Sequence, residues 1–192
     1  MRQLSEALRG KGLGKIVLVI GGSRSGKSDY AQALAETGVG ERYYLATCPV
    51  QQDDDPEMAA RIRAHRQNRQ GRGWQTREEP LALSRLVSTL PEEATLLIDC
   101  LTLWLSNLLF ADLDGVLDEE KIALLACEVL AAGRARRGEM IVVSSEVGCG
   151  LVPEQALARR YRDLVGRCNQ AMAVGADRVV QVVCGIPVTI KG

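Results

Sequence analysis

Residues 16–36 read IVLVIGGSRSGKSDYAQALAE, and this stretch decides the fold. The first five residues are apolar and mostly β-branched, which is typical of a buried strand. Residues 21–28 then satisfy the pattern G-x-x-x-x-G-K-[ST] of a phosphate-binding loop, and a segment with helical spacing follows at 27–36. A chance match in a glycine-bearing turn is the alternative. The strand before the loop and the helix after it favour a nucleotide-binding loop.

Each part of this loop has a physical role in holding a nucleotide. Gly21 and Gly26 let the backbone turn tightly, so that amide N–H groups converge on phosphate oxygens beside a helix N-terminus. Lys27 is expected to reach the β- and γ-phosphates, and the Ser28 hydroxyl to bind the Mg2+ that bridges them. The residues that we predict to bind nucleotide here are Gly21, Gly22, Ser23, Arg24, Ser25, Gly26, Lys27 and Ser28.

A second Mg2+ ligand is expected at the end of another buried strand. Residues 96–99 read LLID, so Asp99 follows an apolar run, as does the acidic residue that accompanies many phosphate loops. We predict that Asp99 binds the metal, directly or through water. The alternative is that Asp99 caps a helix beginning at Leu101, and the two roles are compatible.

Short apolar runs alternate with segments of helical spacing along the whole chain. The predicted strands are 16–20, 43–46, 95–98, 141–143 and 179–183, and the predicted helices are 27–36, 56–69, 101–110, 119–137 and 153–174. The predicted loops are 51–55, 70–79 and 111–118. Residues 186–191 contain Pro187 and are predicted to form an antiparallel edge strand. The fold class is therefore α/β, a three-layer P-loop NTPase-like (RecA-like) fold with a mostly parallel sheet.

The bulk composition favours a soluble protein with one domain. The chain has 192 residues, of which 46% are hydrophobic, so we expect one packed domain over residues 15–192 after a frayed extension over residues 1–14. The 24 basic and 24 acidic side chains cancel, so no nucleic-acid partner is expected. Polar side chains interrupt the apolar stretch 94–113, so no membrane span is expected. Six widely spaced cysteines without a CxxC pair indicate reduced thiols and a cytoplasmic protein.

The single histidine of the chain, His65, lies in the predicted helix 56–69. Spacing alone leaves two interpretations open, a catalytic histidine and a structural one. Arg66 and Arg69 on the same helix are cations that suit a triphosphate. The alternative for both arginines is a solvated helix face.

Several further segments add to the phosphate loop. They are ATCP at 46–49, residues 57–69, WQTREEP at 74–80, DCLTLWLSNLL at 99–109, SEVGCGLVPE at 145–154 and GRCNQ at 166–170. Together they resemble the bifunctional adenosylcobinamide kinase / adenosylcobinamide-phosphate guanylyltransferase family of cobalamin biosynthesis. The resemblance implies phosphorylation of a cobinamide hydroxyl by ATP or GTP, followed by transfer of GMP from GTP onto that phosphate. It also implies a homotrimer with an active site near subunit boundaries.

The resemblance also assigns roles to individual residues. His65 is the counterpart of the histidine that carries GMP covalently, and Ala64 stands where some members have a second histidine. The residues implied in binding the guanine nucleotide are Ala46, Thr47, Cys48, Arg66, Gln67, Asn68, Arg69 and Glu78. Glu78 is equally compatible with a solvated loop acid. One competing function is that of a P-loop kinase for another small hydroxylated metabolite, in which His65 is structural. Another is that of a nucleotide switch or adaptor protein that uses the same loop for regulation.

Overall fold

The computed structural model describes residues 14–48 and 56–192. The predicted frayed extension lies outside the described residues except for Gly14, and so does the predicted loop at 51–55. The strands are β1 (Ile16–Gly21), β2 (Arg42–Ala46), β3 (Trp74–Glu78), β4 (Thr95–Asp99), β5 (Met140–Val143), β6 (Arg178–Val183) and β7 (Ile186–Lys191). The helices are α2 (Lys27–Glu36), α3 (Pro56–Arg69), α4 (Leu83–Thr89), α5 (Leu101–Ala111), α6 (Glu119–Arg134), η1 (Val147–Cys149) and α7 (Ala156–Gly175).

The described strands form one sheet in the order β3-β2-β4-β5-β1-β6-β7. All neighbouring strands are parallel except β6 and β7, which pair antiparallel at one edge. This confirms the prediction of a mostly parallel sheet with an antiparallel edge strand. The phosphate-loop strand β1 lies inside the sheet, between β5 and β6.

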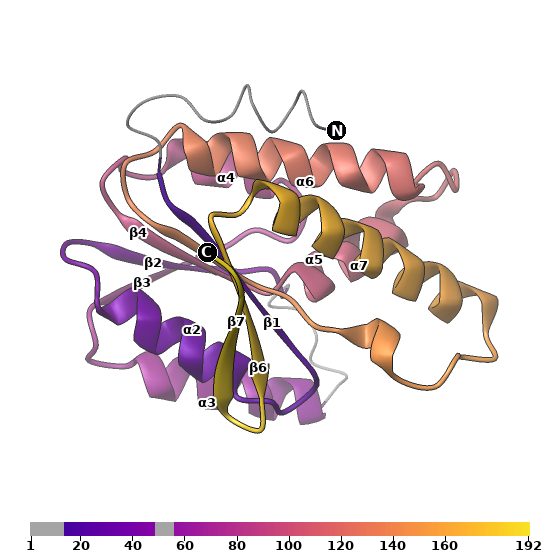
Figure 1. Ribbon diagram of the computed structural model, residues 1–192, viewed down its shortest axis with the longest axis horizontal. Coiled ribbons are helices and arrows are strands. Elements are labelled where there is room, and N and C mark those ends of the chain that lie inside the picture. The colour runs from indigo at the N-terminus through magenta and orange to yellow at the C-terminus, as the bar shows by residue number, and fades with distance from the viewer. Residues whose placement is uncertain (1–13, 49–55) are drawn as a thin grey trace.

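Helices cover both faces of the sheet (Figure 1). Helices α4, α5, α6 and α7 pack on one face, and α2 and α3 lie on the other. Successive β1 side chains point to opposite faces of the sheet. Ile16 and Leu18 pack in the larger hydrophobic cluster. Val17 and Val19 pack in the smaller cluster, which includes residues of α2. Because both faces are buried, the strand reads as a continuous apolar run. In the described ranges, no helix has both the length and the apolar character needed to cross a membrane.

The parallel strands bring the predicted site residues to one edge of the sheet. This is the side of the sheet at which the carboxyl ends of β1, β2, β4 and β5 lie, and not a lateral edge such as β7. In open α/β sheets, ligands bind at the carboxyl ends of the strands. The phosphate loop follows β1, and Asp99 ends β4. Residues that are far apart in the sequence therefore become neighbours.

The structure differs from the predicted elements in several places. Helix α7 begins at Ala156 and not at residue 153, and η1 is an additional single turn of 3-10 helix. Strand β3 forms inside the segment 70–79, which the sequence predicts as a loop, and α4 is an additional short helix. Helix α6 ends at Arg134 and not at residue 137, because the chain turns there and buries Arg136. The Arg136 guanidinium donates hydrogen bonds to the carbonyl groups of Val87, Leu90, Pro91 and Ala94.

Candidate nucleotide-binding site

Two glycines give the phosphate loop at 21–28 its shape. Gly21 ends β1 where a side chain has no room, because a Cβ there would lie 2.6 Å from both the Ser25 Oγ and the Val182 carbonyl oxygen. Gly26 precedes α2 with a φ of +88°, in the left-handed region that glycine favours. The predicted order of strand, tight loop and helix is therefore present, with the α2 N-terminus directly behind the loop.

The loop carries an ammonium group and a hydroxyl group. The Lys27 Nζ donates a hydrogen bond to the Gly22 carbonyl oxygen at 3.0 Å, so the side chain folds back over the loop. Ser23 and Arg24 are exposed, whereas Ser25 is buried. The Ser25 Oγ has no hydrogen-bond partner in the described part of the chain. These groups are donors of the kind that phosphate oxygens accept.

The turn between β6 and β7 supports the loop from outside. The Gly185 N–H donates a hydrogen bond to the Ser25 carbonyl oxygen at 2.8 Å. A Cβ on Gly26 would lie 3.3 Å from the Gly185 Cα, so the two backbones are in close contact. Cys184 and Gly185 have φ values of 51° and 79°, which make this turn tight. The edge hairpin therefore helps to hold the loop conformation.

Asp99 connects the loop to the neighbouring strands. Its Oδ1 accepts a hydrogen bond from the Ser28 hydroxyl at 3.4 Å, and its Oδ2 accepts one from the Tyr44 hydroxyl at 3.0 Å. Burial and the Asp99 charge hold the pKa of Tyr44 well above its usual range, so this hydroxyl remains a donor. Helix α5 has Cys100 as its N-cap residue and no side-chain cap. The alternative that Asp99 caps this helix is therefore wrong.

Ser28 and Asp99 are suited to Mg2+. Both present hard oxygen atoms, and Mg2+ in nucleotide sites is held by one or two protein oxygens together with phosphates and water. Across residues 14–48 and 56–192, no group of three or more His, Cys, Asp or Glu side chains is placed to hold a metal ion. The donor set therefore fits a metal that arrives with a nucleotide.

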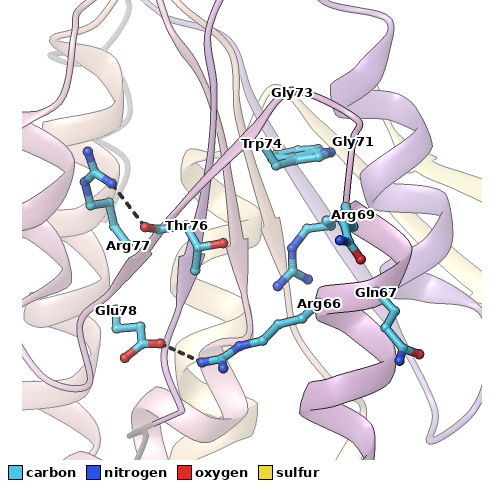
Figure 2. Close-up of a pocket in the computed structure, with 10 residues that line it drawn as sticks. Arg66, Gln67, Arg69, Gly71, Gly73, Trp74, Thr76, Arg77 and Glu78 are labelled. Carbon is cyan, nitrogen blue, oxygen red and sulfur yellow. Dashed lines mark hydrogen bonds and ion pairs between the residues drawn. The ribbon is translucent and has the colours of Figure 1, made fainter.

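A pocket of about 620 Å³ lies between the last turn of α3 and β3 (Figure 2). It is lined by Arg66, Gln67, Arg69, Gln70, Gly71, Gly73, Trp74, Thr76, Arg77 and Glu78. The structure thus brings together four of the residues implied in nucleotide binding, namely Arg66, Gln67, Arg69 and Glu78. The Arg66 Nη2 lies 3.0 Å from the Glu78 Oε1, so an ion pair joins α3 to the end of β3.

Arg69 is the buried cation of this pocket. Its side chain is only 6% exposed, so the interpretation of a solvated helix face is wrong for this residue. Its guanidinium carbon lies 3.3 Å from the centroid of the Tyr44 ring. Its Nε and Nη1 atoms are buried without a hydrogen-bond partner among the described residues. Because unused buried donors are costly, the pocket is suited to an anionic group.

His65 lies beside this pocket on α3. It is half-buried and precedes Arg69 by four residues, so the two side chains share a helix face about 6 Å apart along the axis. Asn68 is exposed. Neither His65 nor Asn68 is among the residues that line the pocket.

The predicted residues at the end of β2 have different environments. Thr47 is fully buried; its Oγ1 donates to the Cys100 carbonyl oxygen at 2.8 Å and accepts from the Cys100 N–H at 3.1 Å. Thr47 therefore ties β2 to β4. Ala46 and Cys48 are half-buried on either side of it. Burial, and then the charge of Glu78, raise the pKa of the Cys48 thiol. The β2–β3 register pairs Ala46 with Glu78, so the chain that follows β2 leaves the sheet beside the Glu78 end of the pocket.

Two residues to which the sequence analysis gave no role organise this edge of the sheet. Tyr44 contacts both Asp99 and Arg69. Asn169 on α7 accepts a hydrogen bond from the Ser144 hydroxyl at 2.6 Å, and so fixes the chain that leaves β5. Asn169 offered a signal, because it is a polar residue on the buried face of a helix, whereas Tyr44 stands in an apolar strand and offered none.

Comparison with known proteins gives a family. Residues 17–190 match the family model described as cobinamide kinase / cobinamide phosphate guanyltransferase. The chain is 46% identical over 180 residues to the bifunctional adenosylcobalamin biosynthesis protein CobP of Pseudomonas aeruginosa, with 91% of this chain and 96% of that protein covered. It is 40% identical over 186 residues to the bifunctional adenosylcobalamin biosynthesis protein CobU of Salmonella typhimurium, with 92% and 99% covered.

Comparison with solved structures concerns the fold alone. A prototypical ATPase from the type III secretion system of pathogenic bacteria superimposes with a TM-score of 0.51 at 12% identity, covering 92% of this chain and 57% of that chain. This likeness agrees with the predicted P-loop NTPase-like fold.

Proposed function

Because the chain belongs to the cobinamide kinase / cobinamide phosphate guanyltransferase family, we propose that it is an enzyme with two activities on a corrinoid substrate. It phosphorylates adenosylcobinamide with ATP or GTP. It then transfers GMP from GTP to adenosylcobinamide phosphate, which gives adenosylcobinamide-GDP and pyrophosphate. The observation that carries the proposal is the connection of the phosphate loop to the α3–β3 pocket through Asp99 and Tyr44.

The phosphate loop binds the polyphosphate in both reactions. Lys27 and the α2 N-terminus offset its negative charge, and the loop amides bind its oxygens. Ser28 and Asp99 hold Mg2+, which when bound neutralises charge on the phosphate oxygens. The hydrogen bond between the Ser28 hydroxyl and the Asp99 carboxylate supports this assignment, because it keeps both oxygen ligands at the loop.

The pocket between α3 and β3 holds the guanosine end of GTP. Arg69 offers unused donors to an anionic oxygen of the α-phosphate, which adjoins the guanosine, and Arg66 and Gln67 line the same wall. Glu78 offers a carboxylate that can accept hydrogen bonds from a guanine base, although the ion pair with Arg66 holds it in the described structure. The proposed site also includes Ala46, Thr47, Cys48 and Asn68. Thr47 acts indirectly, because its hydroxyl holds the backbone of Cys100.

His65 carries the guanylyl group between the two half-reactions. A neutral imidazole nitrogen attacks the α-phosphorus of GTP, a P–N bond forms, and the bond to the β-phosphate oxygen breaks, releasing pyrophosphate. An oxygen of the corrinoid phosphate then attacks the same phosphorus, the P–N bond breaks, and the imidazole is regenerated. Cationic groups at the loop stabilise the leaving pyrophosphate. The position of His65 one turn before Arg69 supports this role.

We extend the proposal to a cytoplasmic homotrimer. Six free cysteines suit a reducing compartment. Large apolar side chains are exposed at Phe110, Leu113, Leu151 and Val152, and such residues are suited to subunit contacts. Light scattering on the purified protein measures the number of subunits directly, and a monomer would contradict this part of the proposal.

The test uses GTP labelled at the α-phosphate. With Mg2+ and no corrinoid, the wild-type protein should retain label that survives alkali and is lost in acid, as expected of a phosphoramidate. His65→Ala should retain none. Arg63→Ala is the matched control, because Arg63 is exposed on the same helix and lies about 200° around the axis from His65.

The outcomes separate the proposal from its competitor. A P-loop kinase for another small metabolite would bind GTP and consume it with its own substrate, but would leave no label on the protein. Absence of label on the wild-type protein, under conditions where GTP binding is measured by calorimetry, would exclude the guanylyl-histidine mechanism. Lys27→Ala should weaken nucleotide binding under either function.

A further inference from the structure

Tyr44 lies where the two halves of the site meet. It is on β2, between the phosphate loop and the α3–β3 pocket, and its side chain is 6% exposed. Its hydroxyl donates to the Asp99 Oδ2 at 3.0 Å. Its ring lies under the Arg69 guanidinium, with 3.3 Å between the guanidinium carbon and the ring centroid. One side chain therefore contacts both the carboxylate at the loop and the cation of the pocket.

The hydroxyl contact fixes the orientation of the Asp99 carboxylate. The terminal torsion of an aspartate is broad, so a carboxylate held through one oxygen can rotate. Here the Ser28 hydroxyl donates to Oδ1 and the Tyr44 hydroxyl donates to Oδ2. Ser28 is itself proposed to bind Mg2+, so Tyr44 is the contact that remains when Ser28 turns to the metal.

The ring contact holds the Arg69 guanidinium without using its hydrogen-bond donors. The Nε and Nη1 atoms of Arg69 have no partner within the described ranges, so the aromatic face is the support that the structure shows for this cation. Trp74 packs edge-on against Tyr44, with ring centroids 6.3 Å apart and planes at 88°. The Trp74 Nε1 donates to the Glu36 Oε1 at 2.8 Å, which ties this aromatic pair to α2.

We propose that Tyr44 is a positioning residue that couples metal binding at the phosphate loop to nucleotide binding in the α3–β3 pocket. The inference rests on the proposed function, because it assigns Asp99 to Mg2+ and Arg69 to the nucleotide. The hydroxyl keeps the Asp99 carboxylate turned toward Ser28. The ring keeps the Arg69 guanidinium in the pocket wall with its donors available. The two parts of one side chain therefore have separable effects.

Tyr44→Phe keeps the ring and removes the hydroxyl. The assay is calorimetric titration of GTP at a series of Mg2+ concentrations. In Tyr44→Phe, the Mg2+ concentration that gives half-maximal GTP affinity should rise about tenfold. This factor corresponds to the loss of one hydrogen bond to a charged group. GTP affinity at saturating Mg2+ and the melting temperature should stay close to those of the wild type. Tyr44→Leu also removes the ring under Arg69, so GTP affinity should fall at every Mg2+ concentration.

Tyr43→Phe is the matched control. Tyr43 is the adjacent β2 residue, 5% exposed, and its side chain packs in the cluster on the opposite face of the sheet. Its hydroxyl also donates to a carboxylate, the Glu41 Oε2 at 3.1 Å, and Arg77 also lies over its ring, at 5.3 Å. Tyr43→Phe therefore loses a hydrogen bond from a tyrosine hydroxyl to a carboxylate, but this carboxylate is Glu41 and not Asp99. Its Mg2+ dependence should equal that of the wild type.

Two results would overturn the proposal. One is an unchanged Mg2+ dependence in Tyr44→Phe. The other is a loss of GTP affinity in Tyr44→Phe that is equal at all Mg2+ concentrations, because that is the effect of a general structural defect. The readout is binding, so it does not depend on turnover. If the wild type binds GTP with Mg2+ but forms no guanylyl-histidine, the proposed function fails while the coupling through Tyr44 remains measurable.

Discussion

Replacing Arg69 with methionine should separate stability from nucleotide binding. Methionine has similar length and flexibility but no charge. In the wild type, Arg69 is 6% exposed and buries two nitrogen donors, Nε and Nη1, without a partner in the described part of the chain. Each such donor costs about 1–3 kcal/mol, and a desolvated cation–π contact returns about 2 kcal/mol. The two donors together cost about 2–6 kcal/mol, so removing them with the cation–π contact should raise the free energy of unfolding by about 0–4 kcal/mol.

The same substitution should weaken GTP binding. Hydrogen bonds from a guanidinium to an anionic oxygen contribute about 1.5–3 kcal/mol, so the dissociation constant for GTP should rise about 10- to 100-fold. Urea unfolding followed by circular dichroism measures the free energy of unfolding. Calorimetry with Mg2+ and GTP measures the dissociation constant. The reasoning is refuted if Arg69→Met loses more than about 2 kcal/mol of stability while GTP affinity is unchanged.

Arg136→Met provides the control with the opposite pattern. Arg136 is 4% exposed, which makes it as buried as Arg69, but its two terminal nitrogens donate to four main-chain carbonyl groups at 2.7–3.2 Å. Its loss leaves these carbonyls without their donors and should cost about 3 kcal/mol or more. GTP affinity should not change. Both residues bury a charge and an unpaired Nε, so the difference reflects the four hydrogen bonds that the terminal nitrogens of Arg136 make.

Three further results are expected. Asp99→Asn should raise the Mg2+ concentration needed for half-maximal turnover about tenfold or more, as read from metal titrations of the steady-state rate. Gly185→Val should weaken GTP binding in calorimetry, because a φ of 79° strains valine and displaces the bond to the Ser25 carbonyl. Burial raises the pKa of Asp177, but hydrogen bonds from Arg134 and the β1 backbone lower it overall to below its usual range. Stability should therefore fall as pH falls through that lowered pKa, and less so in Asp177→Asn, in urea titrations at acidic pH.

The sequence predicted the elements whose signals are local. The strand, loop and helix at 16–36 carry a motif that specifies their order, and Asp99 ends an apolar run that is buried on both faces. Strand β3 escaped prediction because it is an edge strand with the sequence WQTRE, half-exposed to exposed throughout, and pairs with β2 alone. Helix α4 has only seven residues, too few to show a clear helical period.

The contacts that join the site could not be predicted from spacing. Tyr44 reads as one more apolar strand residue, and its role depends on the register that places β2 beside β4, with Ala46 opposite Asp99. The burial of Arg69 likewise depends on where α3 packs, since arginines on a helix are usually solvated. The resemblance to a family named four of the residues that line the pocket, and the structure shows the contacts between that pocket and the loop.

The most direct test of the central claim is a structure of the protein with Mg2+ and a GTP analogue that cannot be cleaved between its α- and β-phosphates. We expect one nucleotide to span both halves of the site, with its terminal phosphates against the amides of residues 21–28, its α-phosphorus within reach of His65, and its guanosine between α3 and β3. A nucleotide whose phosphates lie away from the loop, or whose α-phosphate has no contact with His65, would contradict the proposed function.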